Sequence, residues 1–575
     1  MTPKIATAGR PPWRPAIVDA LRGYDLARFR ADLVAGVTVG LVALPLALAF
    51  GIASGVTPAA GLFTAIIGGF LVALLGGTRM QIGGPTGAFV VIVAGIVAKH
   101  GTTGLLMVTL MAGAILLVLG LTGLGSAVKF IPRPIVIGFT NGIALLIVST
   151  QIKNFFGFRF SDGSTEFFAR MQAIAHNAGT IDTATTLVAT GSLLIAVVVP
   201  RFLPRVPGAV AALVAATLAV RFLHLHVDTV GSRFGSLAAG LPQIVAPHFD
   251  PNLLLPLLPS ACTVALLAAV ESLLSAVVAD SLTGDRHDSN VELIATGVAN
   301  VVVPFFGGIP VTGAIARTAT NIRSGARTPV SGIIHSLTLL AIVALAAPLA
   351  AAVPIAALAA ILVVVAYNMG EWREIATVVR LDNASRSVWF VTFFLTVVAD
   401  LTLAVGIGMS LAALLYIYRI SQTTTVSLVT PEDLEDGKAH VLAGKHFPWY
   451  VSVVRIHGPF LFGTTDALSE RTAEINTYAP IVVLRLRNMT AIDATGLHAL
   501  EDFRLRLERS GRTLLLCGAR DQPARLLHRS NFVRSIGAQN ILPHVRAALE
   551  RAREIHDSFD GLGADVAHDV LAQGL

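Results

Sequence analysis

The chain has 575 residues, of which 54% are hydrophobic and only 13% are charged. A soluble globular domain is about a quarter charged, so this chain has too few polar residues to cover a particle in water. The net charge is +7, but the basic residues mostly flank apolar runs, which is typical of membrane orientation signals. Composition therefore predicts that lipid is the main solvent, and no nucleic-acid partner is expected.

The charge deficit is uneven along the chain. No Asp or Glu occurs from Leu33 to Gln151, whereas the residues after Ser421 have the composition of an ordinary soluble protein. The two cysteines, Cys262 and Cys517, are too far apart in the sequence for a disulfide framework or a zinc cluster. We therefore expect a membrane part, a soluble tail, and no metal or cofactor.

The first 32 residues are rich in Pro and Arg and contain no short apolar region followed by a cleavage site. No signal peptide is predicted. The early arginines favour a cytoplasmic N-terminal segment over residues 1–32 of a multi-pass protein in a bacterial inner (plasma) membrane.

A helix needs about 20 mainly apolar residues to cross the hydrocarbon. Two groups of such runs occur, over about 33–222 and 253–420, and they predict a transmembrane domain over 33–420. With two shorter runs included, the sequence predicts about fourteen segments. The long runs begin at Leu33, Ala59, Leu105, Pro134, Thr183, Pro207, Leu253, Val291, Pro329, Pro354, Ser387 and Leu401.

The third segment of each half is short and interrupted by Gly and Pro. Residues 83–88 read Gly-Gly-Pro-Thr-Gly-Ala, and residues 308–314 read Gly-Ile-Pro-Val-Thr-Gly-Ala. Paired broken helices at matching positions of two halves indicate a transporter's site near the middle of the membrane. The alternative is that Gly and Pro only form two turns between helices.

The tail alternates β-rich and helical patterns. Strands are predicted over 451–456, 481–486 and 513–517, with helices between and after them. This pattern indicates a small α/β domain over 447–575, joined to the membrane part by a polar linker over 421–446.

These motifs resemble the SulP anion transporters, the family that includes the animal solute-carrier-26 proteins. The residues that carry the likeness are 41–50, 83–88, 271–275 and 306–317, and the tail resembles a STAS domain. The resemblance implies an α-helical membrane protein with a seven-plus-seven inverted repeat, as in uracil permeases, divided into core and gate subdomains. It also implies a homodimer, elevator-like movement of the core, and a cytoplasmic STAS domain.

A dehydrated anion inside the membrane needs dipoles and charges to replace its water. The N-termini of two half-helices supply unpaired N–H groups and partial positive charge. We therefore expect substrate to bind at the two half-helix starts, where Thr86 and Thr312 act either as hydroxyl donors or only as helix caps. The candidate residues are Thr86, Gly87, Ala88, Thr312, Gly313 and Ala314.

Arg317 lies four residues after Gly313, and an intramembrane arginine is a functional hypothesis by default. The resemblance also implies a basic residue beside the anion at this position. The alternative places Arg317 in a cytoplasmic loop with Arg323 and Arg327, as an orientation signal.

Glu271 is the only charged residue from Leu253 to Ala279, and Ser275 lies one turn further on. We expect these two residues to couple transport to an ion; the alternative is a buried ion pair that only fixes packing. In relatives that resemble sodium-coupled bicarbonate carriers, the matching positions are typically Asp and Thr. The departure here favours a proton as the coupling ion over sodium.

Three further features have weaker interpretations. Ala43 and Leu46 are apolar where some animal relatives are polar, so one wall of the site is expected to be apolar. The loop over 280–290 resembles a metal cluster but is expected to be solvated. In the tail, Asp493 is expected to cap a helix, and Thr495 stands where related domains present a phosphorylatable serine.

The sequence predicts a secondary active transporter of a small anion, with sulfate, bicarbonate and dicarboxylates all possible. Two alternatives are a passive anion channel and a sodium-coupled bicarbonate carrier. A third treats the membrane part as a sensor whose output is the tail. No enzyme is predicted, because no nucleophile–base pair or phosphate-binding loop occurs.

Overall fold

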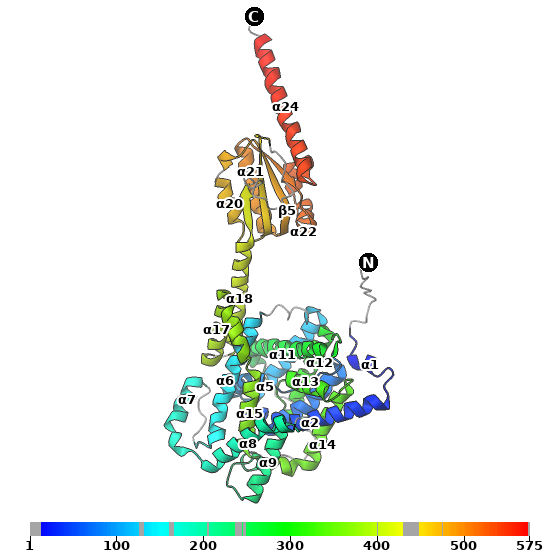
Figure 1. The fold of residues 1–575 in the computed structure, drawn as a ribbon, viewed down its shortest axis with the longest axis vertical. Helices are drawn as coiled ribbons and strands as arrows, with labels where there is room; N and C mark the ends of the chain where they lie inside the picture. Colours follow the sequence, from blue (N-terminus) through cyan, green and yellow to red (C-terminus); the bar gives the residue numbers. More distant parts are fainter. Residues whose placement is uncertain are drawn as a thin grey trace. The chain divides into compact units, whose positions relative to one another are not determined.

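The computed structural model describes residues 13–572 except 126–131, 160–165, 204–205, 236–243, 245–248, 400, 429–447 and 474. The chain divides into two compact units, Met1–Ala412 and Ala413–Leu575 (Figure 1). The first is helical, and the second is built around a five-stranded sheet.

Within the described residues, nine helices are long and apolar enough to cross a membrane. They are Leu26–Ala53 (α2), Pro58–Leu75 (α3, η1 and α4), Gly87–Leu121 (α5), Arg133–Phe156 (α6), Thr183–Phe202 (α8), Pro251–Thr283 (η4 and α11), Ser289–Phe306 (α12 and η5), Ile355–Arg380 (α15 and α16) and Thr402–Thr423 (within α18).

One of these helices is two segments joined at a kink. Gly101, inside α5, has a φ of 67°, a left-handed value that glycine adopts without strain, and the helix is interrupted there. Dividing α5 at Gly101 and adding four further helices gives fourteen segments in the described chain, as the sequence predicts. The four are α9 (Gly208–Phe222), α13 (Ile315–Arg323), α14 (Val330–Ala351) and α17 (Asn383–Val398).

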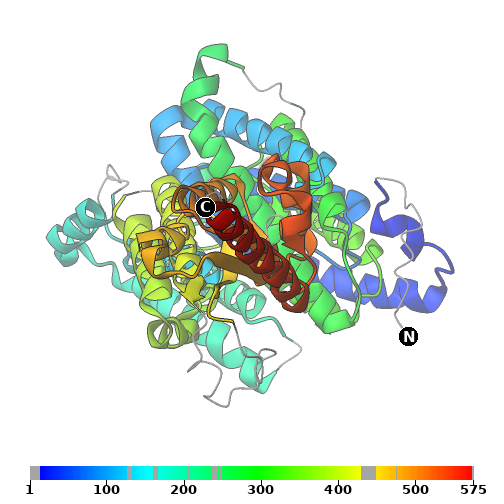
Figure 2. The ribbon, with the colours of Figure 1, turned by 90° about the horizontal axis from the view of Figure 1, so that it is seen from above.

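The two sequence halves are intertwined rather than side by side. Helix α14 packs on α2, α12 on α5, and α17 on α6, so each of these pairs joins one half to the other. Figures 1 and 2 show the same mixing, with blue helices of the first half among green helices of the second. Residues far apart in the sequence therefore meet inside this unit.

The two half-helices meet through a short β-bridge. Strand β1 (Gly83–Gly84) pairs antiparallel with β2 (Thr312–Gly313), with Gly83 opposite Gly313 and Gly84 opposite Thr312. Each strand leads directly into a half-helix, α5 from Gly87 and α13 from Ile315. The pairing therefore brings the two helix starts together, and the interpretation of these motifs as isolated turns is wrong.

The first long helix begins before residue 33. Helix α2 starts at Leu26, and Asp32 inside it is fully buried. The Asp32 carboxylate accepts hydrogen bonds from the backbone N–H groups of Arg327 and Thr328 and from the Thr328 hydroxyl, at 2.7, 3.0 and 2.5 Å. These bonds offset the cost of burying the charge, so the charged residues before Leu33 belong to the helix.

The second unit contains a sheet with the order β3-β4-β5-β6-β7, in which β3 is antiparallel to β4 and the other neighbours are parallel. Helices α20 to α22 cover one face and α24 (Val545–Ala572) begins on the other (Figure 1). The strands are Thr425–Leu428, Val451–Phe460, Ile481–Ile492, Thr513–Cys517 and Ile541–Leu542; the covering helices are Asp466–Ala473 (α20), Ala494–Arg509 (α21) and Asp521–Arg529 (α22).

The linker is shorter than the expected 421–446. Helix α18 (Leu401–Thr423) extends to Thr423, and β3 pairs with β4 as the first strand of the sheet. Val426 in β3 is buried in the sheet's core, which explains why this polar-looking stretch is ordered. The rest of the expected linker, from 429 to 446, lies outside the described residues.

Candidate functional site

A cavity of about 420 Å³ lies where the two half-helices begin. Its lining includes Thr86 and Gly87 from the start of α5, and Gly313, Ala314 and Arg317 from the start of α13. Glu271, from the middle of α11, adds a carboxyl group to the wall. The structure thus brings together six of the residues that the sequence singles out.

Glu271 and Thr86 are directly connected. The Thr86 hydroxyl donates a hydrogen bond of 2.7 Å to Glu271 Oε2, and both side chains are partly exposed to the cavity. Thr86 is the N-cap residue of α5, but its side chain makes no capping hydrogen bond. The simple-cap interpretation of Thr86 is therefore wrong, because its hydroxyl serves the carboxylate instead.

Arg317 is buried at 3% exposure and does not lie in a solvated loop. Its guanidinium donates to the backbone oxygen of Pro85, in the connection between β1 and α5. A guanidinium has five N–H donors, and this bond is the one hydrogen bond that the described residues provide. Arg317 therefore holds the two half-helix starts together and presents its other donors beside the cavity.

Arg317 and Glu271 line the same cavity but form no salt bridge with each other. The carboxylate is bonded to Thr86 and the guanidinium to Pro85. The interpretation of Glu271 as one half of an ion pair with Arg317 is therefore wrong. Space and unused hydrogen-bonding capacity remain between the two charges.

Three of the expected site residues do not line the cavity. Thr312 is fully buried, donates a 3.0 Å bond to the backbone oxygen of Ala268, and lies 3.0 Å from the hydroxyl of Ser272. Ser275 is also fully buried and donates to the Thr318 hydroxyl at 2.9 Å. Ala88 is buried, at 1% exposure, and is not part of the lining.

The positions of Thr312 and Ser275 have a common physical reason. Helix α13 packs against α11 along a polar seam, and in this seam Ser272 accepts the backbone N–H of Gly313 at 2.9 Å. Each buried hydroxyl needs a partner, so Thr312 and Ser275 bond within the seam. They fix the two helices to each other rather than facing the cavity.

One wall of the cavity is apolar, as the sequence predicts. Leu46 and Phe50 from α2 and Val136 and Phe139 from α6 all line the cavity. Ala43 is fully buried and does not reach the cavity. Polar recognition therefore comes mainly from the α5, α11 and α13 side.

Three further polar residues line the cavity that sequence reasoning missed: Thr140, Asn368 and Glu371. Thr140 lies in α6, Asn368 is the last residue but one of α15, and Glu371 directly precedes α16 (Trp372–Arg380). The only signal in the sequence was Glu371, which directly follows Gly370 at the end of an apolar run. A carboxylate in that position is indistinguishable from an ordinary residue at the membrane edge. Only the fold shows that this helix end reaches the site.

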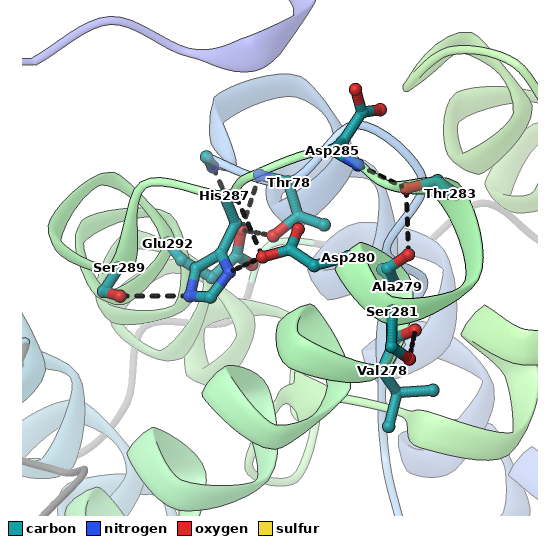
Figure 3. A network of polar contacts seen from close by, with 11 residues as sticks. Thr78, Val278, Ala279, Asp280, Ser281, Thr283, Asp285, His287, Ser289 and Glu292 are labelled. Atoms are coloured by element: carbon teal, nitrogen blue, oxygen red, sulfur yellow. Dashed lines mark hydrogen bonds and ion pairs between the residues drawn. The ribbon is translucent and has the colours of Figure 1, made fainter. Parts of the chain in front are cut away.

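Glu292 is a second buried carboxylate, and the sequence analysis did not identify it. It accepts bonds from the N–H groups of Gly77 and Thr78, both at 3.0 Å, from the Thr78 hydroxyl at 2.8 Å and from Gln81 at 2.7 Å. Figure 3 shows Glu292 beside Thr78. The carboxylate fixes the segment that leads into β1, because its bonds fall on three residues of that segment.

The polar loop over 280–290 contains a chain of hydrogen bonds. His287 Nδ1 lies 2.7 Å from Asp280 Oδ2, and His287 Nε2 lies 3.0 Å from the Ser289 hydroxyl (Figure 3). Among the described residues, no group of three or more His, Cys, Asp or Glu is arranged to hold a metal ion.

In the second unit, Asp493 is the N-cap of α21, as expected. Its carboxylate accepts the N–H of Gly496 at 2.8 Å and that of Phe462 at 3.0 Å. Thr495 lies exposed in the first turn of the same helix. Its modification remains a hypothesis.

Comparison with known proteins agrees with this architecture. The Sulfate permease family matches residues 29–392, and the STAS domain family matches 448–548. The chain is 41% identical to a putative sulfate transporter of Bacillus subtilis over 91% of this chain and 98% of that protein. It is 30% identical to a bicarbonate transporter of Picosynechococcus over 91% and 94% of the two chains.

Two solved structures have the same fold. The transmembrane domain of a cyanobacterial bicarbonate transporter aligns with a TM-score of 0.61 at 34% identity, covering 67% of this chain and 99% of that one. The murine solute carrier 26 family member A9 anion transporter aligns with a TM-score of 0.84 at 18% identity, over 94% of each chain. The second likeness supports the fold alone.

Members of this family are transporters, not enzymes, and the relatives named above are described as carriers of sulfate or bicarbonate. The family match covers most of the helical unit, and the STAS match covers most of the sheet-containing unit. This chain belongs to the sulfate permease family and ends in a STAS domain.

Proposed function

We propose that this chain is a proton-coupled secondary transporter that holds one small anion between the starts of α5 and α13, beside Arg317. The observation that carries the proposal is the cavity where two helix N-termini from opposite sequence halves meet a buried guanidinium and a carboxylate. Helix N-termini and arginine both favour negative charge. The same arrangement gives a cation little stabilisation.

Charge balance supports the proton. The cavity is lined by one guanidinium, Arg317, and by two carboxyl groups, Glu271 and Glu371. An anion that enters while both carboxylates are ionised meets net negative charge in a site of low dielectric constant, where repulsion is strong. Protonation of one carboxyl removes this repulsion, so the anion and the proton favour each other's binding.

Thr86 links the binding of the anion to the protonation of Glu271. Its hydroxyl has one proton to donate, and in the structure that proton is directed at Glu271. A protonated Glu271 no longer needs this bond, which leaves the Thr86 hydroxyl able to donate to an anion. In this scheme Glu271 carries the proton, and the Thr86 hydroxyl binds the anion only when Glu271 is protonated.

Sodium coupling is the alternative that the resemblance to sodium-coupled bicarbonate carriers leaves open. A sodium ion prefers several oxygen ligands around one point. Ser275, the second residue of the expected ion site, donates instead to Thr318 within the helix seam. This arrangement favours the proton, with sodium as the alternative outcome of the transport experiment.

We further propose that the protein is a homodimer in the bacterial inner membrane and moves its substrate by an elevator-like motion. Fourteen crossings are an even number, so both ends of the membrane part emerge on one side. The basic N-terminal residues favour the cytoplasm for that side, which would make the STAS domain cytoplasmic.

The test is uptake of radiolabelled sulfate, bicarbonate and fumarate into proteoliposomes under imposed proton or sodium gradients. The proposal predicts concentrative uptake of at least one of these anions, driven by an inward proton gradient without sodium. Glu271→Gln should abolish the response to the gradient while leaving exchange of labelled for unlabelled anion. Uptake that never exceeds equilibrium would support a channel, and uptake that requires sodium would support the sodium-coupled carrier.

A further inference from the structure

A second cationic cavity lies in the STAS domain, remote in sequence from the transport site. Its volume is about 280 Å³, and four arginines line it: Arg485, Arg487, Arg520 and Arg546. Its described lining contains no Asp or Glu. Four guanidinium groups around one hollow repel each other unless something negative lies between them.

Arg485 forms the buried base of this cavity. Its side chain is 6% exposed, and within the described part of the chain it has neither a hydrogen bond nor an ion pair. Buried arginines are normally paired, because burying an uncompensated charge is costly. An unpaired guanidinium at the base of a cavity therefore indicates a ligand that supplies the missing partner.

The strand register explains why Arg485 faces this side of the sheet. Arg485 lies in β5 opposite Arg455 of β4 and Cys517 of β6. It points to the same face as Val483, which packs under α24, so the alternation of the strand places a charge where an apolar residue would fit. Burial lowers the pKa of Arg485; the neighbouring Cys517 opposes this shift, and the cations Arg487 and Arg455 add to it.

The remaining walls are typical of anion sites in α/β folds. Strands β6 and β7 end at the cavity, and ligands of parallel sheets usually bind at the carboxyl ends of the strands. The start of the long helix α24 also lines the cavity, through Val545 and the preceding His544. His544 Nδ1 accepts the N–H of Ala547 at 3.1 Å, so its proton lies on Nε2 and is available as a donor.

We propose that this cavity binds a diphosphate group, either inorganic pyrophosphate or the diphosphate part of a larger molecule. A single monovalent anion would leave most of the four guanidinium charges unbalanced, whereas a diphosphate supplies several charges and accepts paired hydrogen bonds from arginine. The exposed residues Arg487, Arg520 and Arg546 form the rim, and Arg485 binds from below. The site is independent of the transport cavity and of its proposed function.

The test is titration calorimetry of the full-length protein in detergent, with inorganic pyrophosphate as the probe and orthophosphate and sulfate as comparisons. Arg487→Gln and Arg520→Gln change exposed residues and should each weaken pyrophosphate binding by about tenfold to a hundredfold, the loss expected for one charge-assisted hydrogen bond. Arg485→Met should abolish binding, with the melting temperature measured to confirm folding. Arg509→Gln, an exposed arginine outside the cavity lining, is the matched control and should bind normally.

Three results would overturn the proposal. The first is the absence of pyrophosphate binding to the unaltered protein at millimolar concentration. The second is equal weakening by Arg509→Gln, which would show a general charge effect. The third is equal affinity for pyrophosphate, orthophosphate and sulfate, which would refute a site for two linked phosphates. A larger diphosphate-bearing molecule that binds more tightly than pyrophosphate would support the proposal and identify the source.

Discussion

The two half-helix threonines offer a sharp test, because the structure gives them different roles. Thr86 lines the cavity and donates to Glu271, whereas Thr312 is fully buried in the seam between α11 and α13. Substituting valine for either threonine removes one hydroxyl and preserves the shape. The pair therefore separates loss of a site contact from loss of a packing contact.

The expected magnitudes follow from the hydrogen bonds. Thr86→Val removes one donor to a charged acceptor, worth about 1.5–3 kcal/mol, which is roughly a tenfold to hundredfold loss at the transport site. Thr312→Val removes bonds to neutral partners and leaves the Ala268 oxygen without this donor, at a cost of about 1–3 kcal/mol of stability. Thr86→Ser keeps the hydroxyl and should behave like the unaltered protein.

The assay combines proteoliposome uptake under a proton gradient with the melting temperature of the purified protein. We expect Thr86→Val to lose proton-driven uptake without a comparable loss of stability. Thr312→Val should lower the melting temperature and leave the apparent substrate affinity within about twofold, since it removes no cavity contact. If Thr312→Val impairs affinity as much as Thr86→Val does, or if Thr86→Val transports normally, the assignment of the two roles is wrong.

Three further predictions concern other parts of the chain. A Cβ added at Gly84 would lie 2.7 Å from Nη1 of Arg317, and Gly84 has a φ of 144°. Gly84→Ala should therefore displace the guanidinium and weaken anion binding in the same uptake assay. Normal affinity would contradict this prediction. Glu292→Gln replaces one acceptor oxygen by an NH2 donor at a carboxylate that accepts four hydrogen bonds. It should cost about 1–3 kcal/mol of stability, seen as a lower melting temperature; an unchanged value would contradict it. Burial raises the pKa of Cys517 to about 11, from 9.0 for an ordinary thiol. The alkylation rate of Cys517, followed by peptide mass, should therefore rise with a midpoint near pH 11. A midpoint near pH 9 would contradict this prediction.

The sequence predicted the membrane architecture because hydrophobic length and Gly/Pro interruptions are local signals. The half-helix motifs at 83–88 and 308–314 occupy matching positions in the two halves, and the structure pairs them through β1 and β2. Arg317 and Glu271 were identifiable because an isolated charge in an apolar run is costly and demands an explanation. These predictions needed no knowledge of how the helices are rotated.

The predictions that were wrong depend on how each helix is rotated about its axis and on which neighbours it packs against. Whether Ser275 faces the cavity or the α13 seam depends on which side of α11 meets its neighbour, and residues four apart share a face only approximately. The sequence analysis assigned Asp32 to the N-terminal segment. The hydrogen-bond partners that allow its burial, near Thr328, are almost 300 residues away. Glu371 was missed for the same reason, since only the tertiary fold brings its helix end to the cavity.

The central claim is that Arg317 holds the transported anion at the junction of the two half-helices. Arg323 lies on the same helix two turns later, is exposed, and provides the matched control. The decisive measurement is the affinity of the purified protein for its transported anion in Arg317→Gln and Arg323→Gln. We predict at least about a tenfold loss for Arg317→Gln and an unchanged value for Arg323→Gln. Equal affinities in the two variants would contradict the claim.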